Sequence, residues 1–139
     1  MIKKFLYVFV LFFLSANLFA KSEFLKEGID LYNKNKFEDA KFKFEQDIVF
    51  NPKSELSYLY LSKIFNKQDK KNLEEKNLNT VMLLNPKNEE AIYNLARLKL
   101  TSSDYKESKK LNKILKSICS DFCNKSNQLK SEIENLSKK

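Results

Sequence analysis

Few side chains in this sequence could do chemistry, and the two cysteines are the most informative of them. Cys119 and Cys123 are the only cysteines in a chain of 139 residues that contains no histidine. Without histidine the two thiols cannot complete a zinc site, and their spacing matches neither a redox pair separated by two residues nor a haem-attachment motif. We expect a structural disulfide in an oxidising compartment, and two buried thiols otherwise.

The carboxylates and hydroxyls do not form a catalytic set. Histidine is the commonest general base, so its absence leaves the serines without a partner that could activate them. The neighbours Glu74 and Glu75, and likewise Glu89 and Glu90, diverge on a helix, and we expect them on solvated helix faces. The single glycine, Gly28, cannot form a phosphate-binding loop. We predict that the chain is not an enzyme and holds neither a cofactor nor a metal ion.

The elements that carry these residues repeat along the chain. The tripeptide Asn-Pro-Lys begins at Asn51 and again at Asn85, a spacing of 34 residues (85 − 51), and each copy ends an apolar helical run. The same step connects Gly28, Ser62 and Ala96, three small residues that allow two helices to cross closely. A period of 34 residues is typical of a repeat built from paired helices.

On these residues the sequence resembles the tetratricopeptide repeat family. The family's small, aromatic, small, aromatic and proline positions are matched in order by Gly28, Phe37, Ala40, Phe44 and Pro52. The later repeats depart from the pattern at Lys71, Glu74, Asn112 and Ser120. The resemblance implies an all-α fold of three stacked helical hairpins, an α-solenoid, followed by a capping helix. An unrelated helical bundle is the alternative.

We predict a single domain over residues 21–139, with repeats at about 21–54, 55–88 and 89–122 and a cap helix at about 122–137. Polar breaks separate the two helices of each repeat. On the last helix an apolar stripe is formed by Phe122, Leu129, Ile133 and Leu136, and its outer face is expected to carry Ser126, Lys130, Glu134 and Lys138. Such a helix keeps the open end of a repeat array soluble.

Residues 1–20 have the layout of a secretory signal peptide. Lys3 and Lys4 precede an apolar run over residues 5–14, and the stretch ends at Ala20. Ten apolar residues (14 − 5 + 1) are too few to cross a bilayer as a helix, which takes about 20. We expect cleavage after Ala20; cleavage four residues earlier and an uncleaved N-terminal anchor are the alternatives. Export would place the protein in a bacterial periplasm or cell envelope.

The chain is basic, with 26 Lys and Arg against 18 Asp and Glu and a formal net charge of +8. Loss of Lys3 and Lys4 with the leader would lower that charge to +6 (8 − 2). A basic domain often binds nucleic acid, but export argues against this, and the lysines are spread along the chain. We predict no nucleic-acid partner and interpret the lysines as a solvated surface. A weak contact with an anionic membrane surface or an acidic partner segment stays open.

The resemblance also implies that the first helix of each pair lines a concave groove for a partner peptide. Spacings of four and three residues put each set of side chains on one helical face, and the implied groove residues are Leu25, Ile29, Tyr32, Leu59, Lys63, Asn66, Tyr93, Arg97 and Leu100. The expected partner is a segment of another protein with apolar anchors beside a carboxylate, which Arg97 would bind bidentately. The alternative is that Leu25, Ile29 and Leu59 complete a core.

We therefore predict a non-enzymatic protein-interaction module, or scaffold, of the bacterial cell envelope. The alternative is a structural subunit held permanently in an envelope complex or at a membrane surface, in which the groove never binds a peptide reversibly. Repeat folds serve many roles, so the fold alone does not choose between them.

Overall fold

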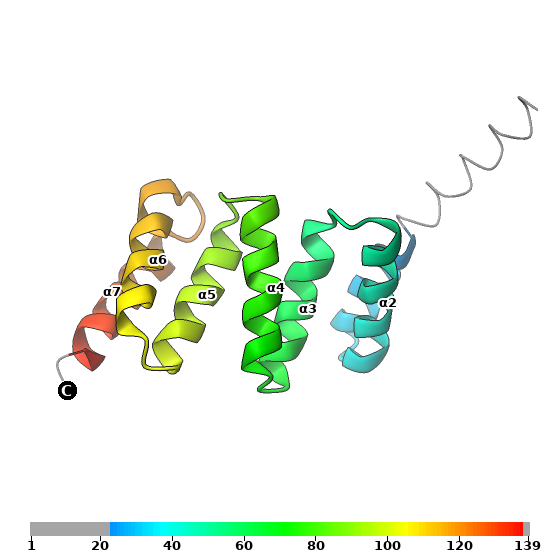
Figure 1. Cartoon of the computed structure of the whole chain (residues 1–139), viewed down its shortest axis with the longest axis horizontal. Coiled ribbons are helices and arrows are strands. Elements are labelled where there is room, and N and C mark those ends of the chain that lie inside the picture. The colour runs from blue at the N-terminus through cyan, green and yellow to red at the C-terminus, as the bar shows by residue number, and fades with distance from the viewer. Residues whose placement is uncertain (1–22, 138–139) are drawn as a thin grey trace, which may run out of the picture. The chain divides into compact units, whose positions relative to one another are not determined.

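The computed structural model describes residues 23–137, and the predicted signal peptide lies outside them. These residues are helical, with no strand among them. A helix over residues 23–33 precedes the helices labelled in Figure 1, which are α2 (Phe37–Phe50), α3 (Glu55–Lys67), α4 (Lys71–Leu84), α5 (Glu89–Thr101), α6 (Tyr105–Ile118) and α7 (Cys123–Leu136). Three helical hairpins and a terminal helix result, which confirms the predicted all-α architecture.

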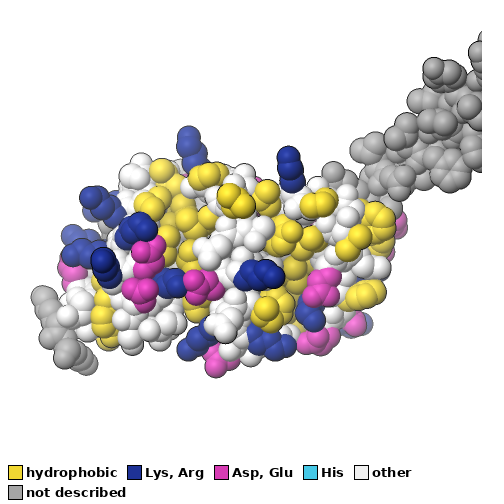
Figure 2. Space-filling view, viewed as in Figure 1, with side chains coloured by type: hydrophobic (Ala, Val, Ile, Leu, Met, Phe, Trp, Pro, Cys, Tyr) yellow, Lys and Arg dark blue, Asp and Glu magenta, His cyan; other side chains and the backbone are white. Residues whose placement is uncertain are grey.

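The chain divides after Tyr60 into two compact units. The N-terminal unit contains the helix over residues 23–33, α2 and the first turns of α3. In the C-terminal unit α5 packs against α4, α6 and α7, and α6 also packs against α7. Charged side chains of both signs are spread over the face shown in Figure 2. Within the described residues, none of the helices combines the length and the apolar character that crossing a membrane requires.

The turn inside each hairpin has the same backbone in all three repeats. Asn35, Asp69 and Ser103 lie 34 residues apart, and their φ angles are all positive, at 59°, 53° and 62°. The N–H of each binds the carbonyl three residues back at 2.9 to 3.1 Å, and the next N–H binds the carbonyl five residues back at 2.9 Å. A left-handed residue in this position satisfies the last carbonyls of a helix. The sequence period is therefore also a period of the backbone.

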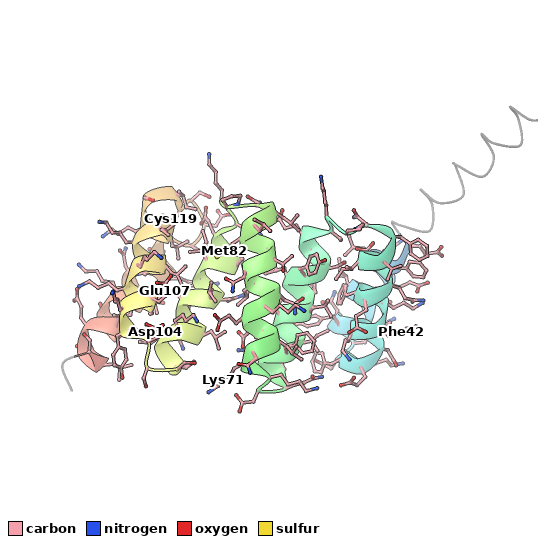
Figure 3. All side chains as sticks on the ribbon, viewed as in Figure 1. Phe42, Lys71, Met82, Asp104, Glu107 and Cys119 are labelled. Carbon is pink, nitrogen blue, oxygen red and sulfur yellow. A yellow bond between two sulfur atoms is a disulfide. The ribbon has the colours of Figure 1, made fainter. Side chains whose placement is uncertain are left out.

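The third of these turns leads into α6 through a side-chain cap. Asp104, labelled with Glu107 in Figure 3, accepts the N–H of Glu107 on its carboxylate at 3.1 Å. The Glu107 carboxylate in turn pairs with Lys110 at 3.0 Å. A carboxylate at the N-cap satisfies one of the free N–H groups of the first turn, so α6 begins at a defined residue.

In the N-terminal unit, Gly28 makes room for an aromatic ring. A Cβ atom at this position would lie 2.7 Å from Cε1 and 2.8 Å from Cδ1 of Phe44, closer than carbon atoms approach. Phe44 is fully buried and stacks on Tyr60 with ring centroids 5.0 Å apart. The helix over residues 23–33 and α2 therefore make their close contact at the small residue that the sequence predicted.

The same unit buries a carboxylate where the repeat elsewhere has an aliphatic side chain. Val81 and Leu115, one and two repeats after Asp47, are fully buried, and so is Asp47. Asp47 Oδ2 accepts a 2.5 Å hydrogen bond from Ser57 Oγ, which itself accepts one from Ser54 Oγ at 3.0 Å. Asp47 Oδ1 has no hydrogen-bond partner among the described residues. Burying a carboxylate with one unpaired oxygen costs free energy, so this position destabilises the first hairpin.

We had expected Glu74 on a solvated helix face, but the structure buries it. It stands where the first repeat has Ala40, and only 4% of it is exposed. Its two carboxylate oxygens accept hydrogen bonds from Asn66 Nδ2 at 3.0 and 3.1 Å. Burial raises the pKa of Glu74, and the Asn66 hydrogen bonds act in the opposite direction. The expectation was wrong because Asn66, on the neighbouring helix α3, provides a partner for a carboxylate in place of a small residue.

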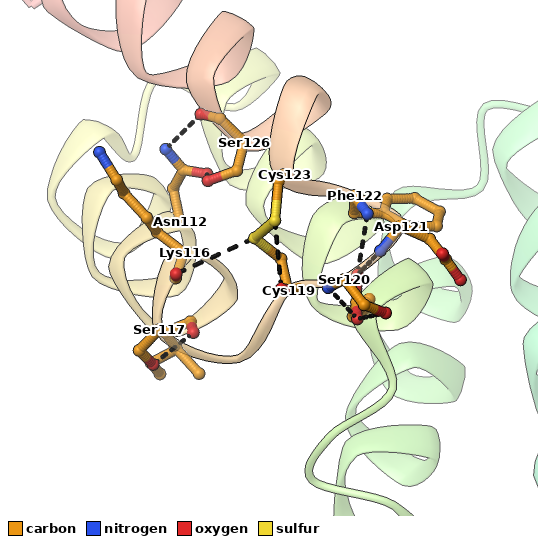
Figure 4. Close-up of a disulfide and its surroundings, with 11 residues drawn as sticks. Asn112, Lys116, Ser117, Cys119, Ser120, Asp121, Phe122, Cys123 and Ser126 are labelled. Atoms are coloured by element: carbon orange, nitrogen blue, oxygen red, sulfur yellow. Dashed lines mark hydrogen bonds between the residues drawn. A yellow bond between two sulfur atoms is a disulfide. The ribbon is translucent and has the colours of Figure 1, made fainter.

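Helix α7 docks on α6 through a buried polar contact. Ser126, expected on the outer face, is 1% exposed. Asn112 Nδ2 donates to the Ser126 carbonyl at 2.9 Å, and Ser126 Oγ donates to Asn112 Oδ1 at 2.9 Å (Figure 4). Leu129 and Ile133 are buried as predicted, whereas Leu136 is 40% exposed. The buried face of α7 includes Ser126 because Asn112, which replaces the Phe44 of the first repeat, needs a polar partner.

Candidate functional site

The predicted groove residues of the N-terminal unit differ in exposure. Leu25, Ile29 and Tyr32 are half-buried, while Leu59 is a core residue with 4% exposure. The Tyr32 ring lies edge-on to Tyr60, with centroids 5.1 Å apart. Leu59 therefore completes the core instead of lining a groove, and its side chain is not accessible to a partner.

In the C-terminal unit, one face of α5 lies between α3 and α7. Glu90, Tyr93 and Arg97 follow one another at spacings of three and four residues, which places them on the same side of the helix. Lys63 of α3 pairs with Glu90 at 2.8 Å, and Arg97 pairs with Glu132 of α7. Two ion pairs thus connect this side of α5 to the helices on either side of it.

Between the two ion pairs lies an aromatic pair with a cation above it. The rings of Tyr93 and Phe122, the residue before α7, are tilted with centroids 5.6 Å apart. Lys125 Nζ lies 4.0 Å from the Phe122 ring centroid and 5.4 Å from that of Tyr93. A lysine over aromatic rings is a favourable cation–π arrangement. We call the whole surface the α5 face, formed by Lys63, Glu90, Tyr93, Arg97, Phe122, Lys125 and Glu132.

The remaining predicted groove residues of this unit have other roles. Leu100 continues the spacing of Arg97, yet it is 4% exposed and belongs to the core. Asn66 is exposed, but its amide is engaged with the buried Glu74. Lys63, Tyr93 and Arg97 therefore lie on an accessible face, as the sequence predicted. Leu100 was assigned to that face wrongly, because α5 packs against neighbouring helices on more than one side and a spacing of three or four residues does not show which side a residue faces.

The sequence suggested that Arg97 is free to bind the carboxylate of a ligand. In the structure it already pairs with a carboxylate of the chain itself. Its guanidinium is engaged by Glu132, and the two side chains are 39% and 47% exposed. Exposed ion pairs contribute about 0 to 1 kcal/mol, so this pair can exchange one carboxylate for another. Sequence reasoning missed Glu132 because its position opposite Arg97 depends on how α7 docks, which local periodicity does not encode.

A single carboxylate holds the start of α7 next to α5. Glu89 Oε1 accepts hydrogen bonds from the N–H and Oγ of Ser120 at 2.7 and 2.9 Å. Its Oε2 accepts the N–H groups of Asp121 and Phe122 at 3.1 and 2.8 Å. These hydrogen bonds, that of the Phe122 N–H foremost, lower the pKa of Glu89 below its ordinary value. Glu89 was expected on a solvated face; instead it positions Phe122 beside Tyr93.

A disulfide closes the same turn. It joins Cys119, the residue after α6, to Cys123, the first residue of α7, with Cα atoms 5.2 Å apart (Figure 4). No helix runs through the bridge, because α6 ends at Ile118. The earlier repeats have Asn-Pro at this point, so the disulfide and Glu89 replace a proline turn. Among the described residues no cluster of three or more metal-ligating side chains is placed to hold a metal ion.

Solved structures with this arrangement of helices are repeat domains. The TPR2B domain of yeast Sti1 in its pHsp70 complex has a TM-score of 0.78 and 13% identity, over 85% of this chain and 98% of that one. The Yersinia enterocolitica chaperone SycD, in complex with a YopD peptide, has a TM-score of 0.75 and 16% identity, over 85% and 94%. This chain has the tetratricopeptide repeat fold.

The Arabidopsis OM64 tetratricopeptide repeat domain is a third example, with a TM-score of 0.74 and 19% identity, over 88% of this chain and 98% of that one. No family model matches the sequence, and no curated protein matches it. Identities this low establish the fold alone. Within the tetratricopeptide repeat fold, α5 is the first helix of the third hairpin, and α7 takes the place of the first helix of a fourth.

Proposed function

We propose that the protein is a non-enzymatic protein-interaction module that binds an acidic segment of a partner protein at the α5 face. The observation that carries this proposal is the exchangeable ion pair of Arg97 and Glu132 beside the aromatic pair of Tyr93 and Phe122. Tyrosine and arginine are the side chains that most often dominate binding energy at protein interfaces. Two proteins of the same fold are seen with peptide or protein partners, SycD with a YopD peptide and Sti1 with pHsp70, which supports a protein partner here.

Binding at this face would work by exchange of carboxylates. A partner carboxylate displaces Glu132 from the Arg97 guanidinium, which can hold it through two parallel N–H groups. An adjacent apolar side chain of the partner packs against the Tyr93 and Phe122 rings. The face carries three cations, Lys63, Arg97 and Lys125, against two carboxylates, so its charge favours an acidic segment. In the N-terminal unit, Leu25 and Ile29 remain predicted apolar contacts.

The place of action that we propose is the bacterial cell envelope. The support is the layout of residues 1–20, in which a cationic start, an apolar run and a terminal alanine follow one another as in a secretory leader. A disulfide between Cys119 and Cys123 agrees with an oxidising compartment. A weak contact of the lysines with anionic lipid remains part of this proposal.

A second candidate function rests on the exposed apolar side chains of α2. Phe42, labelled in Figure 3, is 59% exposed, Val49 is 74% exposed and Phe50 is 50% exposed. Phe42 and Val49 are seven residues apart and lie on one side of the helix. Large exposed apolar side chains gathered on one element mark interaction surfaces. A subunit assembled permanently into an envelope complex would bury them.

A capture experiment tests the α5 face. The full chain is immobilised, and proteins bound from an extract of the source cells are identified by mass spectrometry. We expect the double variant Tyr93→Ala, Arg97→Glu to lose the bound protein by at least about tenfold, since truncated hot spots cost more than about 1 kcal/mol each. The matched control is Lys106→Glu, an exposed charge reversal on α6 that should leave capture unchanged.

The other outcomes separate the two candidate functions. If the double variant captures the same protein as the unmodified chain while circular dichroism shows both folded, binding is not at the α5 face. If no protein is captured reversibly and the chain elutes as a stable assembly in size-exclusion chromatography, the permanently assembled subunit is supported. Loss of that assembly in Phe42→Ser, Val49→Ser would place the interface on α2.

A further inference from the structure

Helices α6 and α7 enclose a pocket of 220 Å³ that is separate from the α5 face. Its rim carries Lys109, Lys113 and Lys116 from α6 and Lys130 from α7, and the buried side chains of Asn112 and Ile133 lie at its floor. The helical spacing puts Lys130 about opposite Glu132, which faces α5. A ligand in this pocket would therefore not touch the α5 face.

The rim of this pocket has an excess of positive charge. Lys109, Lys113 and Lys116 are exposed and follow at spacings of four and three residues along one side of α6. They make no ion pair with any residue that the structure describes, and the single carboxylate of the rim, Glu134, lies 3.7 Å from Lys130. Figure 2 shows several Lys or Arg side chains, with acidic side chains beside them, near the region labelled α6 in Figure 1. Like charges at such spacings repel, so an anionic ligand would stabilise this side of α6.

The interior of the pocket is apolar. Ile133 supplies apolar surface at its floor, and the aliphatic stems of the surrounding lysines supply its walls, since lysine keeps its methylene groups along apolar surface and its ammonium in water. A volume of 220 Å³ holds one bulky apolar side chain. This volume is too small for a whole lipid acyl chain, and a concave site flanked by a carboxylate does not fit a flat bilayer surface.

We propose that this pocket is a second docking site, which binds an acidic amphipathic helix of a partner protein. The two neighbouring helices α6 and α7 leave a groove into which a third helix can pack. One apolar side chain of that helix would occupy the pocket, and carboxylates on either side of it would meet Lys109, Lys113 and Lys116. Both this pocket and the α5 face are proposed to bind an acidic segment, but the pocket requires that the segment be a helix with one apolar face.

The test uses a fluorescein-labelled synthetic peptide of leucine and glutamate, with leucines at helical spacing. Its binding is followed by fluorescence anisotropy, with the full chain carrying Tyr93→Ala and Arg97→Glu so that the α5 face does not contribute. A failure of the pocket proposal can then be distinguished from a failure of the proposed binding at the α5 face. We expect saturable binding that falls at least tenfold in Lys113→Glu, Lys116→Glu. A similar loss is expected in Ser137→Trp, which fills the pocket without changing its charge. Lys106→Glu, on the same helix outside the pocket, should change affinity less than twofold.

Four results would overturn this inference. Absence of saturable peptide binding would do so directly. Equal binding of a scrambled peptide, with the same composition but no apolar face, or full affinity in Ser137→Trp would reduce the effect to unspecific attraction between charges. Binding of vesicles containing phosphatidylglycerol that Lys113→Glu abolishes, without binding of the peptide, would make the occupant an anionic lipid. Thermal melts by circular dichroism confirm that each variant is folded.

Discussion

Replacing Gly28 by alanine will lower the free energy of unfolding by about 1 to 3 kcal/mol, the usual cost of forcing extra atoms into a packed site. The direction is opposite to helix propensity, which favours alanine over glycine by about 1 kcal/mol. The new Cβ would lie 2.7 Å from the Phe44 ring, which is fully buried and stacked on Tyr60. Urea unfolding followed by circular dichroism measures the change.

The second repeat suggests the matched control for this variant. Ser62 and Leu78 occupy the positions of Gly28 and Phe44 one repeat later, and both are buried. Phe44→Leu removes the ring that clashes with the new methyl group, so Gly28→Ala combined with Phe44→Leu should lose less stability than the sum of the two single variants, by about 1 kcal/mol. Strict additivity would show that the ring does not set the requirement for glycine.

The double variant Asp47→Val, Ser57→Ala will raise the free energy of unfolding, by about 1 to 4 kcal/mol. It recreates the buried pair of Val81 and Ala91 from the next repeat. Both changes remove polar groups from the core, including a carboxylate oxygen without a hydrogen-bond partner among the described residues. Replacing both partners of a buried polar contact by apolar groups of similar shape is neutral or stabilising. The buried Ser54 hydroxyl loses its hydrogen bond to Ser57 in this variant, which offsets part of the gain.

Ser57→Ala alone should have the opposite effect. It removes the hydrogen bond to Asp47 Oδ2 and leaves the buried carboxylate without that donor, at a cost of about 1 to 3 kcal/mol. Thermal melts of the single and double variants, run at the same pH, compare the two. A double variant less stable than the unmodified chain would mean that the buried Asp47 carboxylate stabilises the first hairpin, which would contradict our interpretation that it destabilises it.

The sequence predicted the hairpins well because their determinants are local. The spacing of Asn51 and Asn85 and the small residues Gly28, Ser62 and Ala96 give the period, and the period gives the order of helices. The same period applied to the turns would also have found their left-handed residues, of which Asn35 and Asp69 are types that tolerate positive φ.

The buried polar contacts could not be predicted in the same way. Glu74 depends on Asn66 of another helix, and Asn112 depends on Ser126 of α7. Each looked like a departure from the repeat pattern when considered alone. Its partner is set by how one helix is rotated against the next, and periodicity within a single helix does not fix that rotation.

For the candidate site, the sequence predicted that Tyr93 and Arg97 share an accessible helix face, but it did not predict which residues surround them. Phe122 and Glu132 reach them because α7 packs beside α5, where Glu89 and the disulfide hold the turn that leads into α7. That placement changes the proposed binding mechanism from simple capture of a partner carboxylate to competition with the internal carboxylate of Glu132. The measurable consequence is that Glu132 should weaken the binding of an acidic partner.

The most direct test of this account is the affinity of the captured partner segment for two variants of the full chain, measured by isothermal titration calorimetry. Glu132→Gln removes the internal competitor and should tighten binding by about two- to fivefold, the equivalent of an exposed ion pair of up to about 1 kcal/mol. Arg97→Glu should weaken it at least about tenfold. Weaker binding in Glu132→Gln, or unchanged binding in Arg97→Glu, would contradict the proposal that a partner carboxylate replaces Glu132 on Arg97.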